Sequence, residues 1–226
     1  MIIKKFESSS ILEDKLLSLI EVNLRVETKS SNEVKVLLSG GLCSLSLYKR
    51  FNEISNVNWS KVKFGLVDER WIDNDSKESN FHNISEALGD SILQKATLTP
   101  LVYDLKNEKN NLSLAKMSNS IFLNQKTIVI LELGFDGHTA SLFPETIQTE
   151  NALSEIYSNI SLNIAPENPK KRLTHNFKSL LNSKKIILNV LGKENEDVLK
   201  RAKNELLPIS YIMNTLCSEV EIFWAD

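Results

Sequence analysis

Residues 128–144, I-V-I-L-E-L-G-F-D-G-H-T-A-S-L-F-P, decide how the rest of the chain is interpreted. The segment opens as an apolar run rich in β-branched residues and then meets Gly134 and Gly137. A short apolar run that ends in glycines is typical of a buried strand followed by a tight loop. This loop carries Asp136 and His138. Because open α/β sheets bind ligands beyond the carboxyl ends of their strands, the pair is a candidate acid–base site.

The same spacing also fits a plain turn. Asp-Gly is a common turn pair, and a single loop histidine is often only a surface or capping residue. Short motifs match by chance at an appreciable rate, so the pair alone favours neither interpretation. The choice between an acid–base site and a plain turn therefore depends on the rest of the sequence.

Composition narrows the class of protein. The chain has 226 residues, of which 42% are hydrophobic and 25% charged, which is typical of a soluble globular protein with one large domain or two small ones. The sequence shows no linker, repeat or low-complexity block, so we expect a single domain over residues 1–226. A net charge of −2 without a basic face argues against nucleic acid as a partner. The sequence has neither an apolar run of bilayer length nor a signal peptide, so we expect a cytoplasmic protein that does not bind membranes. Cys43 and Cys217 lie far apart without metal-ligand spacing, which predicts neither a disulfide nor a metal site.

Helical and strand patterns alternate along the chain. Helical spacing of apolar residues predicts helices over 10–28, 47–54, 79–89, 114–123, 176–181 and 193–204, with a last short helix from Pro208. Apolar runs predict strands over 34–38, 62–67, 97–102, 128–131, 159–164, 185–191 and 221–224. This alternation predicts an α/β fold with three layers, in which a mostly parallel, Rossmann-like sheet has helices on both faces.

Two helix ends have specific signals. Ser10 and Glu13 have capping-box spacing at the start of the first helix. Ser79 is expected to cap the third helix, and Gly89 is expected to end it.

Ser39, Gly40 and Gly41 stand between the strand over 34–38 and the helix after it. Backbone amides at such a helix start, aided by the helix dipole, form an anion site that is typical of phosphate binding. A plain tight turn fits equally well, because the Gly-Lys-Ser/Thr ending of a P-loop is absent. The turn does not continue into a dinucleotide fingerprint, so no nucleotide cofactor is expected.

Two further strand ends, and one residue upstream of the second strand, supply charged groups. Asp68 and Arg70 follow the strand over 62–67, Lys193 follows that over 185–191, and Arg172 lies upstream of it. Arginine can hold a phosphate through two hydrogen bonds and lysine acts as a point charge, so a phosphorylated ligand fits this set. The alternative for Asp68 and Arg70 is a solvated turn with an ion pair.

With these motifs in order over about residues 34–226, the chain resembles the 6-phosphogluconolactonase family, which shares a structural superfamily with the glucosamine-6-phosphate isomerases (deaminases). The resembling motifs are S-G-G at Ser39, D-E-R at Asp68, S-N at Ser79, L-G-F-D-G-H-T-A-S-L-F-P at Leu133, R-L-T at Arg172, G-K at Gly192 and P-I-S at Pro208. The D-G-H-T-A-S-L-F-P run is the specific one. The resemblance implies hydrolysis of 6-phospho-D-glucono-1,5-lactone without a cofactor or metal, by a monomer or small homo-oligomer.

The resemblance also implies roles for residues. His138 is expected to activate a water as general base, with Asp136 orienting the loop or stabilising the imidazolium. The residues expected to bind substrate are Ser39, Gly40, Gly41, Asp68, Arg70, Arg172 and Lys193. Which of the three cations contacts phosphate stays open.

Two other functions are alternatives for this sequence. The amino-sugar isomerases carry a glutamate before the proline of this motif, where this chain has Phe143, and a Tyr or similar residue where it has Arg70. A non-catalytic sugar-phosphate sensor usually carries an appended DNA-binding domain, which this sequence does not suggest. The chain departs from the family pattern at Leu42-Cys43, where the family usually has a small or hydroxylated residue. It also departs at Glu132, where the family tends to be apolar or glycine-rich.

Overall fold

The computed structural model describes residues 3–216 and 218–226, so Cys217 and the expectation about its disulfide lie outside the described residues. Within them, every strand pair of the main sheet is parallel. The order of its seven described strands is β1 (Ile3–Phe6), β10 (Glu219–Ala225), β9 (Ser183–Leu191), β6 (Lys126–Glu132), β2 (Val34–Leu38), β3 (Val62–Leu66) and β5 (Thr97–Thr99). The predicted parallel α/β fold is therefore confirmed, and β1 is a strand that the sequence did not predict.

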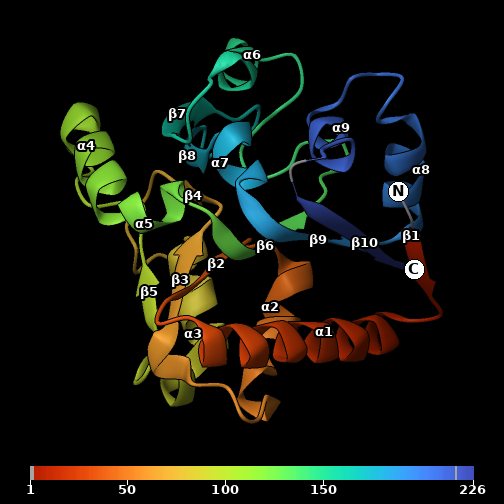
Figure 1. Cartoon of the computed structure of the whole chain (residues 1–226). Helices are drawn as coiled ribbons and strands as arrows, with labels where there is room; N and C mark the ends of the chain where they lie inside the picture. Colours follow the sequence, from red (N-terminus) through yellow and green to blue (C-terminus); the bar gives the residue numbers. More distant parts are fainter. Residues whose placement is uncertain (1–2, 217) are drawn as a thin grey trace.

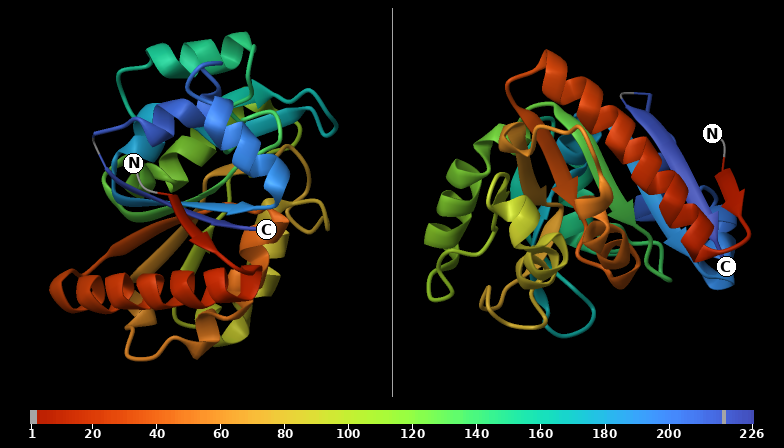
Figure 2. Two further views of the ribbon diagram at one scale, coloured as in Figure 1. Left: turned by 90° about the vertical axis from the view of Figure 1, so that its right-hand side faces the viewer. Right: turned by 90° about the horizontal axis from the view of Figure 1, so that it is seen from below.

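Helices cover both faces of this sheet, as the two directions of view in Figures 1 and 2 show. One face is covered by α1 (Ser9–Ser30), α2 (Leu42–Lys49) and α3 (Asn80–Leu93). The other face is covered by α5 (Ser120–Leu123), α6 (Ile147–Ser154), α7 (Phe177–Leu181), α8 (Lys193–Arg201) and α9 (Pro208–Met213). Helix α4 (Glu108–Ser118) lies beside the β5 edge, and short 3₁₀ turns occupy Phe51–Glu53 and Trp59–Lys61. No helix of the described residues combines the length and apolar character needed to cross a bilayer.

The central strand β6 explains why the opening segment of the sequence is so apolar. Its side chains alternate between the faces: Ile128 and Ile130 join one hydrophobic core, while Val129 and Leu131 join the other. All four side chains are fully buried. A strand covered on both faces has no solvent side, so it is continuously apolar rather than alternating.

Three strands form a second sheet that the sequence did not predict. It is antiparallel, with the order β4 (Asp68–Arg70), β8 (Lys171–His175) and β7 (Ile160–Ile164). Only Val67 separates the end of β3 from the start of β4, so this small sheet starts at the carboxyl edge of the main sheet. The segment Asp68–Arg70 is thus a strand and not the solvated turn of the alternative interpretation, and the strand expected over 159–164 belongs to the small sheet.

Two predicted helix ends are corrected. The side chain of Ser8, and not that of Ser10, accepts the capping hydrogen bond at the start of α1. Helix α3 does not stop at Gly89: the backbone kinks there with φ 67° and the helix resumes to Leu93. The Ser79 cap is confirmed, because its hydroxyl accepts from the amide of His82 at 3.2 Å.

The chain changes direction between β2 and β6. After β2 it adds β3 and β5 on one side, and after β6 it adds β9 and β10 on the other. Such a switch point leaves a crevice at the carboxyl ends of the two neighbouring strands. The glycine turn after β2 and the Asp-Gly-His loop after β6 therefore meet at this crevice.

Candidate active site

A cavity of about 510 Å³ occupies the switch point. Eight of the nine expected site residues line it: Ser39, Gly40, Gly41, Asp68, Arg70, Asp136, His138 and Arg172. They come from the ends of β2 and β6 and from β4 and β8 of the small sheet. The cavity is therefore lined by residues of both the main sheet and the small sheet.

The loop after β6 is closed by its own backbone. The amide of Gly134 donates to the carbonyl of His138 at 2.9 Å, and the amide of Gly137 donates to the carbonyl of Gly134 at 2.9 Å. The amide of Ile209 in α9 donates to the carbonyl of Gly137 at 3.1 Å. The loop is thus fixed from inside and from α9, which positions its side chains before any ligand binds.

The imidazole of His138 is held on three sides. Asp136 Oδ1 lies 2.5 Å from Nδ1 and also accepts from the backbone amide of His138 at 3.0 Å. The ring lies against Gly134, where an added Cβ would come within 2.2 Å of Nδ1, so only glycine leaves room for it. The ring of Phe143 packs beside it, with centroids 4.8 Å apart. With a proton on Nδ1 shared with Asp136, Nε2 carries the free lone pair that a general base needs.

The carboxyl group of Asp136 is the group of this pair whose pKa the surroundings lower. Burial raises the pKa of the Asp136 carboxyl, but the hydrogen bonds and the charge of His138 outweigh burial and leave that pKa below its usual value. Asp136 therefore stays ionised at neutral pH and can stabilise an imidazolium beside it.

Two arginines enter the cavity from the small sheet. Arg70 and Arg172 are directly paired across the antiparallel ladder of β4 and β8. Arg70 Nη1 donates to Asn80 Oδ1 and to the carbonyl of Glu78, each at 2.8 Å. Nε of Arg172 is buried and has no hydrogen-bond partner among the described residues. Burial, together with the charge of Arg70, lowers the pKa of Arg172, so an anion in the cavity would relieve both effects.

Asn80 and Ser141 line the cavity but were not predicted as site residues. The carboxylate of Asp68 accepts from the hydroxyl of Ser141 and from Asn80 Nδ2, the latter at 3.4 Å. Both residues lie inside motifs that carried the family resemblance. Their role depends on contacts with Asp68 across 12 and 73 residues of sequence, which spacing does not reveal.

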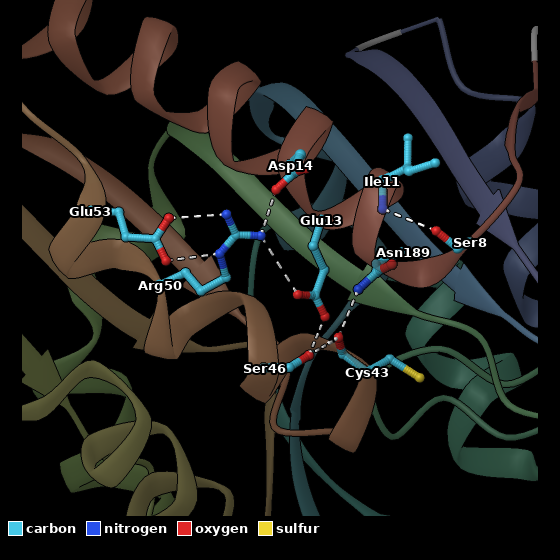
Figure 3. A network of polar contacts seen from close by, with 9 residues as sticks. All are labelled: Ser8, Ile11, Glu13, Asp14, Cys43, Ser46, Arg50, Glu53 and Asn189. Atoms are coloured by element: carbon cyan, nitrogen blue, oxygen red, sulfur yellow. Dashed lines mark hydrogen bonds and ion pairs between the residues drawn. The ribbon is translucent and has the colours of Figure 1, made fainter.

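Helix α2 is anchored firmly behind the glycine turn, as Figure 3 shows. Glu13 of α1 accepts from the hydroxyl of Ser46 at 2.5 Å, and Asp14 of α1 lies 2.8 Å from Arg50. At the amino end of the helix, Asn189 of β9 donates to the carbonyl of Cys43 at 3.1 Å. These contacts fix the first-turn amides of α2 at the cavity.

The structure does not bring Lys193 to the cavity, which corrects the expectation for that residue. Its side chain is 79% exposed and lies 3.2 Å from Asp226 in an ion pair. Lys193 is the first residue of α8, which leads away from the switch point over the neighbouring strands β9 and β10. The G-K motif therefore marks a strand end without placing its cation at the ligand.

The remaining candidates are structural. His175 is fully buried with Nδ1 2.7 Å from the hydroxyl of Ser179. Burial raises the pKa of the Cys43 thiol to about 11, with a further contribution from Glu132, so the thiol is a poor nucleophile. Among the described residues, no group of three or more His, Cys, Asp and Glu is arranged to hold a metal ion.

This fold agrees with that of known proteins. The chain belongs to the family described as glucosamine-6-phosphate isomerases/6-phosphogluconolactonase, whose model matches residues 7–224. A Helicobacter pylori protein named 6-phosphogluconolactonase is 33% identical over 201 residues, which cover 87% of this chain and 86% of that protein. A Rhizobium meliloti protein of the same name is 25% identical and covers 97% of both chains. The crystal structure of a 6-phosphogluconolactonase from Shewanella baltica is 27% identical, covers 100% of this chain and 98% of its own, and has a TM-score of 0.91.

Proposed function

We propose that this protein hydrolyses 6-phospho-D-glucono-1,5-lactone to 6-phosphogluconate, the lactonase step of the oxidative pentose phosphate pathway. One observation carries the proposal: the Asp136–His138 pair and the two arginines Arg70 and Arg172 line a single cavity. The pair supplies a base for water, and the arginines supply positive charge for a phosphate. The lactonase names of the relatives and of the similar crystal structure support it.

In the proposed mechanism, His138 removes a proton from a water molecule through Nε2 while Asp136 holds Nδ1. The water oxygen attacks the lactone carbonyl carbon and forms a tetrahedral intermediate. The bond between that carbon and the ring oxygen then breaks, and the protonated His138 returns its proton to the leaving oxygen. A lactone carbonyl is already electrophilic, so the reaction needs neither a covalent nucleophile nor a cofactor.

The other residues that line the cavity are proposed to bind the substrate. Arg70 and Arg172 bind the phosphate, and the amides of Gly40 and Gly41 contribute where α2 begins. Asp68, held by Ser141 and Asn80, accepts from sugar hydroxyls. Lys193 has no part in this assignment.

Isomerisation of an amino-sugar phosphate is not favoured. That reaction needs a proton-transferring group before the motif's proline, and Phe143 cannot exchange a proton. In this chain Phe143 supports the ring of His138 instead. Asp68 lines the cavity, so one carboxylate that could act as a base is present. The argument against isomerisation therefore depends on the absence of the glutamate that Phe143 replaces.

The test follows freshly made lactone by NMR with and without protein, because the lactone also hydrolyses unaided. Faster loss of the 1,5-lactone with protein, and a smaller effect on unphosphorylated gluconolactone, is expected. Equal loss with and without protein would refute the proposed activity.

A further inference from the structure

Glu132, the last residue of β6, places its carboxylate at the start of α2. Oε1 accepts from the backbone amide of Ser44 at 2.7 Å. Oε2 lies 1.7 Å from the position that a Cβ on Gly41 would occupy, so the carboxylate packs directly against the α-carbon of Gly41. Glu132 also lines the cavity. Its carboxylate therefore takes up part of the space beside the glycine turn.

That space is where the substrate's anion is expected. The first-turn amides of a helix have no intrahelical acceptor, and the helix dipole favours a negative charge there. In this chain a carboxylate from β6 already accepts from one of those amides. Gly41 is the N-cap of α2 and has no side chain to cap it, so Glu132 supplies the capping group.

The neighbouring arginine brings the ligand's phosphate to the same place. A Cβ on Gly40 would lie 2.4 Å from Asn80 Oδ1, and the same oxygen accepts from Arg70 Nη1 at 2.8 Å. Arg70, Asn80, Gly40 and Gly41 thus form one short chain of contacts that ends at Glu132. A phosphate held by Arg70 beside the glycine turn would therefore lie close to the carboxylate of Glu132.

We propose that Glu132 is an internal anion of the phosphate site, so that the cavity binds a phosphorylated ligand more tightly when Glu132 is protonated than when it is ionised. The inference rests on the proposed function and adds to it a residue that sets the affinity for the phosphate. A protonated carboxyl can donate a hydrogen bond to a phosphate oxygen, whereas a carboxylate repels it.

The groups around Glu132 place its titration near neutral pH. Burial raises the pKa of Glu132 to about 7, with a further increase from Asp68 of β4, against which the bonds to Ser44 and the charge of His138 act. From α2, Cys43 and Tyr48 face it, and burial first and the Glu132 charge second raise the pKa of both, so neither ionises in this range.

The test measures binding of 6-phosphogluconate by calorimetry at pH 5.5 and pH 8.5. It compares the full-length protein with Glu132→Gln, which mimics the protonated side chain at every pH. Titration of the ligand's phosphate is common to both proteins and cancels in the ratio of their affinities. We expect a ratio near one at pH 5.5 and about tenfold tighter binding by Glu132→Gln at pH 8.5, the factor for a ligand that shifts one pKa by one unit.

Two variants complete the experiment. Glu167→Gln removes an exposed carboxylate that lines the same cavity, and the ratio of its affinity to that of the unaltered protein should not change with pH. Glu132→Gly, which empties the space beside Gly41, replaces Glu132→Gln if the latter does not fold. A ratio that is equal at the two pH values would overturn the inference and leave the proposed function intact. Absence of 6-phosphogluconate binding by the unaltered protein would overturn both.

Discussion

Arg70 and Arg172 face each other directly across the antiparallel ladder between β4 and β8, so two guanidinium groups project from neighbouring strands. Like charges at paired positions repel, and an antiparallel pair places them close together. The two side chains line the same cavity, where Nε of Arg172 lacks a partner among the described residues. A phosphate between them would neutralise this repulsion.

Arg172→Ala should therefore weaken binding of the phosphorylated lactone far more than binding of gluconolactone. Loss of a charge-assisted hydrogen bond costs roughly 1.5–3 kcal/mol, or about ten- to a hundredfold in affinity. KM and inhibition by 6-phosphogluconate measure the effect. Lys193→Ala is the matched control and should change neither, because its side chain pairs with Asp226 outside the cavity. Equal losses on both lactones would mean that Arg172 supports the fold and not the phosphate.

Apart from β1, the strands of the main sheet could be predicted because each of them carries its own apolar signal. The strand over 34–38 is found where it was predicted, since a strand buried on both faces is apolar throughout. The small sheet gave no such signal. Strand β4 consists of Asp68, Glu69 and Arg70, and it forms because it pairs with Lys171–His175 about a hundred residues later. Polar strands stabilised by distant partners are invisible to local patterns.

The site was predictable to the extent that its residues follow strand ends. His138 and Asp136 lie two residues apart in one loop, so their contact was implied by sequence. Lys193 also follows a strand end, but its exposed side chain pairs with Asp226 and does not line the cavity, and this placement depends on tertiary structure. The sequence does not reveal the place of the Glu132 carboxylate in the site, because its contact with Ser44 spans 88 residues.

Amino-sugar isomerisation should be absent. Glucosamine 6-phosphate is expected to give neither ammonia nor fructose 6-phosphate under conditions in which lactone hydrolysis is readily seen. The reason is that Phe143 packs on the ring of His138 where the isomerases carry a proton-transferring glutamate. A coupled assay for both products is the measurement. Turnover of the amino sugar comparable to that of the lactone would overturn the assigned activity while leaving the fold intact.

The burial of His175 predicts that the free energy of unfolding decreases at acidic pH. Burial, with a contribution from the charge of Lys126, lowers the pKa of His175 to about 3. The unfolded chain binds this proton near pH 6.5 and the folded chain only near pH 3, so the free energy of unfolding falls as the pH drops through that window. The loss from this group is at most about 1.4 kcal/mol per pH unit.

Denaturant unfolding at pH 4, 5 and 6 measures that dependence. Between pH 6 and pH 4, the unaltered protein should lose stability more steeply than His175→Gln. His82→Gln, which changes a partly exposed histidine of α3, should keep the steep dependence. Parallel curves for His175→Gln and the unaltered protein would show that His175 titrates alike in both states.

The central claim is that His138 activates the water that opens the lactone. Its most direct test is the rate of lactone hydrolysis by His138→Ala, measured by NMR on freshly made substrate and corrected for uncatalysed loss. The account predicts turnover about 10²–10⁴-fold below that of the unaltered protein, the usual span for a positioned general base, and normal turnover by His82→Ala. Near-normal turnover by a folded His138→Ala protein would contradict the account.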